Sequence, residues 1–356
     1  MSAKYYTRRL TRRVLTAFVA VGLALTALNV LLAATPDAGE LKSADELALL
    51  LKARVGAEWS TPDLFPERIV ACEQFRRRVM IFRPGVDWND PEAVEWSWDP
   101  GDAMTEEQAK WFNHIDECKP ALGDKVILVT SSTSGAAAVR VRDKKLLFLA
   151  RPGGSVHSIA RFPDGNLVTA SSTGRFLALY VVPDERWLDD FNGDVGVSEC
   201  VKKYELKDAH GVVWDAKRQI LWALGGEEFV GYEYSGTKDA PELREVFRVK
   251  LQGTQVNGHD LYPAPGYDAL MTTGAGINVF DPEKRAFTTV AKQPKIKSIS
   301  LAHDGTTIIQ RALESYWADR IHYGDAADAV AGRLDGAHFY KARWFVPNRF
   351  SEPAAE

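Results

Sequence analysis

The chain has 356 residues, of which 46% are hydrophobic and 26% charged, and its formal net charge is -4. This hydrophobic share is that of an ordinary folded globular protein. The slightly acidic balance, without long runs of one charge, argues against a nucleic-acid-binding protein and against an acidic tail.

The N-terminus has the pattern of an export signal. Basic residues between Lys4 and Arg13 precede a nearly uncharged apolar run, Val14–Ala34. A basic start followed by an apolar core is typical of a secretory signal peptide. The run is also long enough to cross a bilayer as a helix, and Leu32 makes the cleavage site mediocre. We therefore expect residues 1–34 to be a signal peptide or a signal anchor, with the rest of the chain secreted or anchored outside the cytoplasm.

Residues 35–66 are predicted to form a polar connector. Ser43 and Glu46 have the spacing of a capping box, and leucines follow them at helical spacing, so we expect a short helix there. At the other end of the chain, residues 348–356 are expected to form a flexible tail.

The cysteines give little structural information. Cys72, Cys118 and Cys200 are an odd number without a C-x-x-C pair, which argues against a structural zinc or a thioredoxin-type centre. A location outside the cytoplasm permits a disulfide between Cys72 and Cys118. The sequence leaves the formation of this bond open.

From Ile69 onward the chain consists of short apolar runs separated by turns rich in Asp, Gly and Pro. Several segments repeat one order: a His or Lys, a short apolar strand, a turn and a second strand. They recur about every 40 to 50 residues, the length of a four-stranded propeller blade. The residues that open these segments are Lys119, His157, His210, His259 and Lys297.

These repeats predict an all-β fold, a six-bladed β-propeller over residues 67–347. The segment Ile69–Gln74 would open a degenerate first blade, and Phe339–Phe345 would be a late strand that helps to close the ring. A β-sandwich is the alternative fold.

The residue that opens each repeat is the strongest functional candidate, because the innermost strands of a propeller bring equivalent residues to one axis. Three of the 7 histidines, His157, His210 and His259, fall on this position. Three imidazoles suit a divalent metal such as Mn²⁺, Fe²⁺ or Zn²⁺, with Gln74 or Glu73 as a further ligand.

The lysines of the ring suggest a second role. Beside a cation, Lys119 or Lys297 would lose proton affinity and act as a base. Without a metal, the same ring would be a cationic pocket suited to carboxylates. The alternative is a ring of polar side chains that bind water and tie the blades together.

Two residues outside the ring are candidate substrate contacts. Trp98 belongs to a tryptophan-rich segment that would stack on sugar rings, with inter-blade packing as the alternative. Arg311 would pair with a second carboxylate or form a salt bridge at a blade edge. His114, His322 and His338 have no place in the repeat and are interpreted as structural or exposed. No G-x-S-x-G motif supports a serine hydrolase.

Five short motifs carry a family resemblance. They are Ala71-Cys-Glu-Gln74, Trp96-Ser-Trp-Asp-Pro100, Asp116-Glu-Cys-Lys-Pro120, His157-Ser158 with Phe162-Pro-Asp-Gly165, and Lys341-Ala-Arg-Trp344. Over most of residues 69–345 the chain resembles an uncharacterised family of secreted six-bladed propellers. The resemblance implies the fold and export, and it implies no reaction.

A looser resemblance is to the oligogalacturonate lyases, which are propellers that cleave uronate oligosaccharides by β-elimination. Their central histidines hold a manganese ion together with a glutamine. The resemblance implies His157, His210, His259 and Gln74 as metal ligands here. The chain departs from this family by its lysines at two ring positions.

These features favour a metal-assisted lyase-type enzyme that acts on an acidic sugar or another carboxylate. The metal would neutralise the carboxylate and acidify the adjacent C–H. The alternatives are a non-catalytic propeller that binds glycan or protein, and a tailoring enzyme for small molecules. We expect a small-molecule or oligosaccharide substrate, no nucleic acid, and membrane contact only through an uncleaved N-terminal segment.

Overall fold

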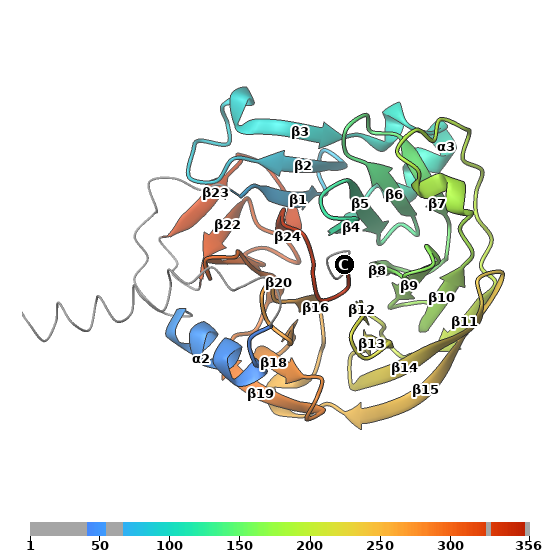
Figure 1. Cartoon of the computed structure of the whole chain (residues 1–356). Helices are drawn as coiled ribbons and strands as arrows, with labels where there is room; N and C mark the ends of the chain where they lie inside the picture. The colour runs from blue at the N-terminus through green and yellow to red at the C-terminus, as the bar shows by residue number, and fades with distance from the viewer. Residues whose placement is uncertain (1–40, 55–66, 325–328, 353–356) are drawn as a thin grey trace, which may run out of the picture. The chain divides into compact units, whose positions relative to one another are not determined.

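The strands of the chain are arranged as blades around a central axis. The computed structural model describes residues 41–54, 67–324 and 329–352. Within these residues the strands form six four-stranded antiparallel sheets (Figure 1). The six-bladed propeller that the repeats predict is therefore confirmed.

The first three blades, each given from the axis outward, have these bounds. Blade 1 contains β24 (Phe339–Trp344), β1 (Ile69–Glu73), β2 (Arg78–Phe82) and β3 (Val94–Trp98). Blade 2 contains β4 (Ile115–Ala121), β5 (Val126–Ser131), β6 (Ala136–Arg140) and β7 (Leu146–Ala150). Blade 3 contains β8 (Val156–Arg161), β9 (Leu167–Ser171), β10 (Phe176–Tyr180) and β11 (Lys202–Glu205).

The other three blades follow the same order. Blade 4 contains β12 (Gly211–Asp215), β13 (Ile220–Leu224), β14 (Glu228–Thr237) and β15 (Ala240–Lys250). Blade 5 contains β16 (Asp260–Pro263), β17 (Leu270–Thr273), β18 (Ile277–Asp281) and β19 (Ala286–Ala291). Blade 6 contains β20 (Ile296–Leu301), β21 (Thr307–Arg311), β22 (Arg320–Tyr323) and β23 (Val330–Arg333).

The ring closes by joining the two ends of the propeller. Strand β24 pairs antiparallel with β1, with Trp344 opposite Ile69 and Ala342 opposite Ala71. The late strand therefore closes the ring as predicted, but it is the innermost strand of blade 1, and β1 is the second. Pairing the last strand with the first leaves no open seam in the ring, which removes two free sheet edges.

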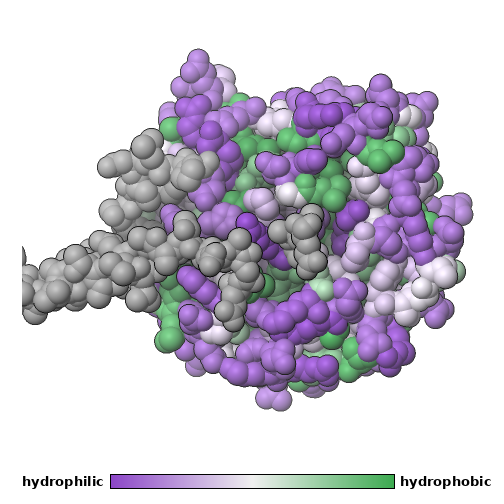
Figure 2. All heavy atoms as spheres, viewed as in Figure 1, coloured by the Kyte–Doolittle hydropathy of each residue, from purple (hydrophilic) through white to green (hydrophobic). Residues whose placement is uncertain are grey.

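The hydrophobic core is divided among the blade interfaces. Each pair of neighbouring blades buries one apolar cluster between its sheets. Between blades 6 and 1, for example, Phe82 stacks on Trp88 with ring centroids 4.1 Å apart, and Tyr323 packs beside them. Because both faces of most blades are covered, many strands are apolar throughout. The outer rim visible in Figure 2 is mainly hydrophilic.

Helices are few among the described residues. The predicted connector helix is present as α2 (Ala44–Arg54), and the capping box closes as expected, with Ser43 Oγ donating to Glu46 Oε2 at 2.8 Å. Short helical turns lie in loops: α3 (Glu106–Ala109) and 3₁₀ turns at Pro91–Ala93, Pro100–Asp102, Lys110–Phe112, Asp184–Trp187 and Gly253–Gln255. None of the helices in the described part of the chain is long and apolar enough to cross a membrane. The predicted segment 1–34 lies outside that part.

The structure brings two of the three cysteines together. Cys72 on β1 and Cys118 on β4 are buried side by side at the interface of blades 1 and 2, and both are free thiols. Burial and the neighbouring Cys118 raise the pKa of Cys72 well above its ordinary value. The pair therefore packs as inert apolar side chains in this structure.

Candidate functional site

A cavity of about 840 Å³ lies at one mouth of the central channel. Its lining comes from all six blades and includes Asp116, His157, His210, His259 and Lys297. A volume of this size is typical of sites for small molecules. The polar lining distinguishes this cavity from the apolar interfaces between the blades.

One equivalent position in each blade contributes to the bottom of the cavity. The residues at this position are Asp116, His157, His210, His259, Lys297 and Tyr340. In β4, β8, β20 and β24 the pairing with the next strand shifts register here. A bulge turns the extra residue away from the regular alternation of the strand, which explains how these side chains reach the channel mouth.

The three histidines of the predicted ring lie against one another. The His157 and His210 rings stack with centroids 4.3 Å apart, and the His210 and His259 rings meet edge to face at 5.2 Å. Burial lowers the pKa of all three, and the nearby cation Lys341 lowers each further. The imidazoles are therefore neutral near pH 7 and lie in a positive potential.

Lys297 is joined directly to this cluster. Its Nζ lies 3.0 Å from Nε2 of His259. Burial, and then the charge of Lys341, lower the pKa of Lys297 to about 8. When the ammonium donates to Nε2, the His259 proton is on Nδ1, which has no hydrogen-bond partner in the described structure. The pair thus places in the pocket an amine that is partly deprotonated near pH 8.

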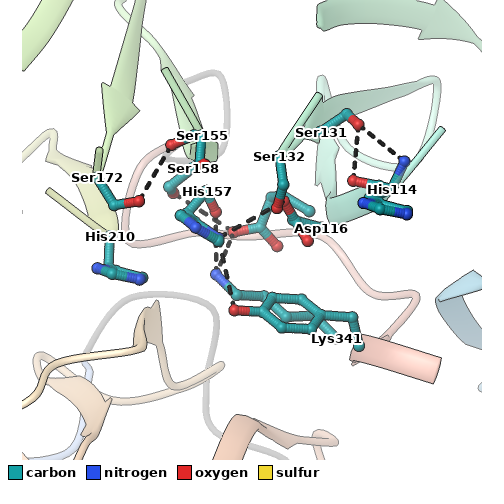
Figure 3. Close-up of polar contacts among 12 residues, drawn as sticks. His114, Asp116, Ser131, Ser132, Ser155, His157, Ser158, Ser172, His210 and Lys341 are labelled. Atoms are coloured by element: carbon teal, nitrogen blue, oxygen red, sulfur yellow. Dashed lines mark hydrogen bonds and ion pairs between the residues drawn. The ribbon is translucent and has the colours of Figure 1, made fainter. Parts of the chain in front are cut away.

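Asp116 is the acidic group of the ring. Its carboxylate accepts hydrogen bonds from the Ser132 hydroxyl and, at 2.8 Å, from the Gln74 amide. The His157 Nδ1 lies 3.6 Å from its Oδ2, and Figure 3 shows Asp116, Ser132 and His157 converging. Burial raises the pKa of Asp116 to about 7. Gln74, predicted as a metal ligand, lines the pocket, and its amide nitrogen donates to this carboxylate.

Below the ring a fully buried ionic cluster blocks the channel. It consists of Glu117, Asp260, Lys341 and Arg343. Arg343 bonds Asp260 at 2.6 and 2.7 Å, and Lys341 lies 3.3 Å from Asp260 and 3.5 Å from Glu117. Burial alone would raise the pKa of Glu117, but Arg343, Lys341 and Lys119 lower it to about 2. These charges form the closed floor of the pocket.

Lys119 lies beyond that floor and does not line the pocket. Its ammonium donates to Ser158 Oγ at 3.1 Å and to the carbonyls of Ile159 and Val212 at 2.9 and 2.8 Å. The repeat predicts Lys119 at the ring position, but the register of β4 against β5 places Asp116 there. The bulge between Ile115 and Glu117 is invisible in a hydrophobic pattern, which explains the error.

The two predicted substrate contacts also lie away from the pocket. Trp98 is only 1% exposed and packs edge to face on Phe112 in the core between blades 1 and 2. The packing alternative is therefore correct for Trp98. Arg311 ends β21 and donates to Gln293 Oε1 at 2.5 Å. Neither side chain lines the cavity.

Several aromatic side chains at the mouth of the cavity were not predicted from the sequence. Phe75 and Tyr316 line the cavity while 67% and 64% exposed, and Trp317 stacks on His338 with centroids 3.5 Å apart. His114 and His338, interpreted from sequence as structural or exposed, also line the cavity. These residues come from loops outside the repeat, so no periodic signal marks them.

Another part of the mouth is rich in hydroxyl groups. Ser132, Ser155, Ser172 and Thr173 line it from blades 2 and 3, and Thr173 Oγ1 donates to Ser155 Oγ at 3.2 Å. Figure 3 shows Ser155 and Ser172 near His157 and His210. A mouth lined by both aromatic and hydroxyl side chains suits a ligand with a ring and several polar groups.

The ring does not fit a divalent metal as its side chains are placed. Among the described residues no group of three or more His, Cys, Asp or Glu side chains is arranged to hold a metal ion. The Nε2 of His259 is taken by Lys297, and His157 and His210 stack nearly parallel, with 20° between their rings. The positive potential of Lys297 and Lys341 further disfavours a cation.

Comparison with known proteins gives one family. The profile described as "Family of unknown function (DUF6528)" matches residues 52–356, which is most of the chain. A comparison with curated proteins gives no match.

Three similar solved structures have low identity to the chain. Kuenenia stuttgartiensis hydrazine synthase shares 9% identity with a TM-score of 0.41, over 59% of this chain and 60% of that one, so the chain spans less than two thirds of its length. A protein of unknown function from Bacteroides caccae shares 12% identity with a TM-score of 0.46, and the match covers 79% of this chain and 99% of that one. A protein from Lactobacillus plantarum shares 11% identity with a TM-score of 0.44, and the match covers 62% of this chain and 71% of that one.

Proposed function

The chain belongs to this DUF6528 family of unknown function, and we propose that it is a lyase-type enzyme that moves a proton on a small carboxylate, such as an acidic sugar. The observation that carries the proposal is the presence of Lys297 and Asp116 on one pocket floor, with pKa values of about 8 and about 7. A base that is partly free and an acid that is partly protonated near neutral pH are what general acid–base catalysis requires.

The charge of the pocket supports an anionic substrate. Lys297 lies within the lining, and Lys341 beneath it lowers the pKa of each ring histidine. Burial causes most of this lowering, but the part that comes from the charge of Lys341 also attracts a carboxylate bound in the pocket.

The proposed reaction is an elimination. The Lys297 amine takes the proton from the carbon next to the carboxylate, and that electron pair forms a carbon–carbon double bond as the C–O bond at the next carbon breaks. The Asp116 carboxyl group gives its proton to the departing oxygen. The products are an unsaturated acid and an alcohol. Lys119, the other lysine predicted as a base, has its ammonium fixed by three acceptors outside the pocket, so the geometry favours Lys297.

The closed floor limits the shape of the substrate. Glu117, Asp260, Lys341 and Arg343 are completely buried across the channel. A polymer therefore has no straight path through the propeller. We expect the pocket to accept a small molecule or the end of a chain, with its ring against the aromatic side of the mouth near Phe75.

A divalent metal held by His157, His210, His259 and Gln74 stays a hypothesis, and no step above depends on it. Element analysis of the purified protein, compared with His210→Ala, decides it: a stoichiometric metal lost in the variant would support the metal. The predicted location outside the cytoplasm is likewise kept as part of the proposal, because a basic and then apolar N-terminus supports export.

The proposal is tested by incubating the protein with uronate oligosaccharides and small sugar acids and recording the absorbance of an unsaturated product. Product is expected with the wild type, and Lys297→Met is expected to reduce its rate by at least about 100-fold. Lys292→Met, at an exposed lysine in the connector between β19 and β20, is the matched control. Absence of product from every acid, at any pH between 6 and 9, would contradict the elimination.

One observation favours the alternative of a binding module without catalysis. Phe75 and Tyr316 are exposed aromatic side chains on one rim of the mouth, which is a common arrangement for stacking on a sugar ring. Binding of a glycan that is lost in Phe75→Ala and Tyr316→Ala, but kept in Lys297→Met without any turnover, would support this alternative.

A further inference from the structure

A second anion-binding feature lies in the turn between β4 and β5. Leu122 and Gly123 both have positive φ angles, 51° and 74°, so their successive N–H groups form a concave nest. The carboxylate of Glu352 occupies it, accepting from Leu122 N at 2.8 Å and from Gly123 N at 3.0 Å. The turn is thus already shown to hold a carboxylate from a peptide segment.

An arginine faces the same carboxylate. Arg161 lines both cavities that Glu352 lines, and its guanidinium lies 4.9 Å from the ring centroid of Trp187. Its Nε makes no hydrogen bond within the described residues. Burial lowers the pKa of Arg161, and Glu352 opposes that effect. The positive charge of Arg161, which is shared among Glu352, Asp164 and Asp184, lies beside the nest and favours an anionic ligand there.

The nest opens into a hollow of about 590 Å³ that shares no lining residue with the central pocket. Among the described residues that line this hollow, the charged ones are Arg161, Arg349 and Glu352. Two cations against one carboxylate leave room for a second negative charge. Phe162 and Ala216 give the hollow an apolar side along which a peptide would lie.

The C-terminal segment stays attached without the Glu352 contact. Phe350 is buried among apolar residues of blades 4 and 5, and its carbonyl accepts from Ala216 N at 3.2 Å. Ser351 Oγ donates to the carbonyl of Trp214 at 2.7 Å. Release of the Glu352 side chain therefore frees the nest and leaves the segment in place.

We propose that this hollow binds a short acidic peptide segment, whose carboxylate replaces that of Glu352 in the nest formed by Leu122 and Gly123. Glu352 then acts as a tethered competitor, which lowers the apparent affinity for the peptide. The site is independent of the reaction proposed for the central pocket.

The test uses the ¹⁵N-labelled full chain and the peptide acetyl-Ala-Glu-Ala-amide, with the Gln peptide and sodium acetate for comparison. In Glu352→Ala we expect the Leu122 and Gly123 amide signals to shift on addition of the Glu peptide, with a Kd at least about 10-fold lower than in the wild type. Adding Arg161→Gln should remove the shift. Glu205→Ala, at an exposed glutamate of blade 3, should bind as the wild type does.

Three results would overturn the proposal: no shift of either amide in Glu352→Ala, an equal response to the Gln peptide, or binding of acetate as tight as that of the peptide. The last result would leave a bare carboxylate site without a peptide. Thermal unfolding checks that each variant is folded. If Glu352→Ala does not fold, the same experiment is done with Glu352→Gln, which keeps the shape of the side chain, and the same results would overturn the proposal.

Discussion

The ammonium of Lys297 lies 3.0 Å from Nε2 of His259, although the two residues belong to different blades. The contact depends on the packing of neighbouring blades, because the innermost strands β16 and β20 of blades 5 and 6 lie next to each other. It places an amine whose pKa is about 8 beside an imidazole whose pKa burial and Lys297 lower to about 2. This pair and Asp116, which lies in the same pocket, supply the groups for the proposed acid–base chemistry.

The pH dependence of the proposed reaction follows from these two groups. The base must be deprotonated, which favours pH above about 8, and the acid must be protonated, which favours pH below about 7. The product of the deprotonated fraction of Lys297 and the protonated fraction of Asp116 gives a bell-shaped curve against pH, with its maximum between these two values. Initial rates between pH 5.5 and 9.5 are expected to follow it. A rate independent of pH over this range would contradict the assignment.

Removal of the acid should change the shape of that profile. In Asp116→Asn we expect the decline of the rate on the alkaline side of the maximum to disappear and the rate to fall by about 100-fold, because the side chain no longer donates a proton. Asp304→Asn, at an exposed turn, is the control. An unchanged profile in Asp116→Asn would assign the proton donor to another residue.

The buried histidines should make folding sensitive to acid. Their pKa values are lower in the folded than in the unfolded chain, so the unfolded state binds more protons once the pH falls below about 6.5. Stability is then lost as the pH falls, by about 1.4 kcal/mol per pH unit for each histidine. Asp116, whose pKa is raised to about 7, has the opposite slope over the same range.

Urea unfolding at pH 7, 6 and 5 measures this slope. We expect His157→Gln to be less sensitive to acid than the wild type by about 1 kcal/mol per pH unit over this range, because one of the buried imidazoles is gone. His303→Gln, at an exposed turn, should keep the slope of the wild type. Equal slopes in all three proteins would show that the folded chain protonates His157 freely.

The ionic floor should be costly to break. Lys341→Met removes one of the cations between Glu117 and Asp260 and leaves excess negative charge in a fully buried cluster. We expect a loss of about 3–5 kcal/mol in the free energy of unfolding, measured by urea titration. Lys202→Met breaks the exposed pair with Glu242 and should have no measurable effect. A similar result for both variants would mean that the floor is solvated.

The sequence was informative wherever the repeat was regular. His157, His210, His259 and Lys297 were found because a period of about 40 to 50 residues placed them on one axis, and the structure does bring them together. Asp116 was missed because a one-residue bulge in β4 changes the register without changing the hydrophobic pattern.

Other features depend on contacts that no local pattern records. Strand β24 is innermost in blade 1 because it pairs with a strand from the other end of the propeller. The repeat therefore gave no sign that Lys341 and Arg343 lie at the channel. Trp98 and Phe75 illustrate a second difficulty: both are aromatic and near blade 1, but one is buried and the other exposed. Which side of a strand or loop faces the core is decided by the packing of neighbouring blades.

Transfer of deuterium from D₂O to the carbon next to a carboxylate is the measurement that tests the central claim most directly, because it detects proton removal even when no bond to a leaving group breaks. With a bound sugar acid we expect NMR to show this exchange in the wild type, and to show none above background in Lys297→Met. Binding of the acid without any exchange in the wild type would contradict a catalytic role for Lys297 and the pocket around it.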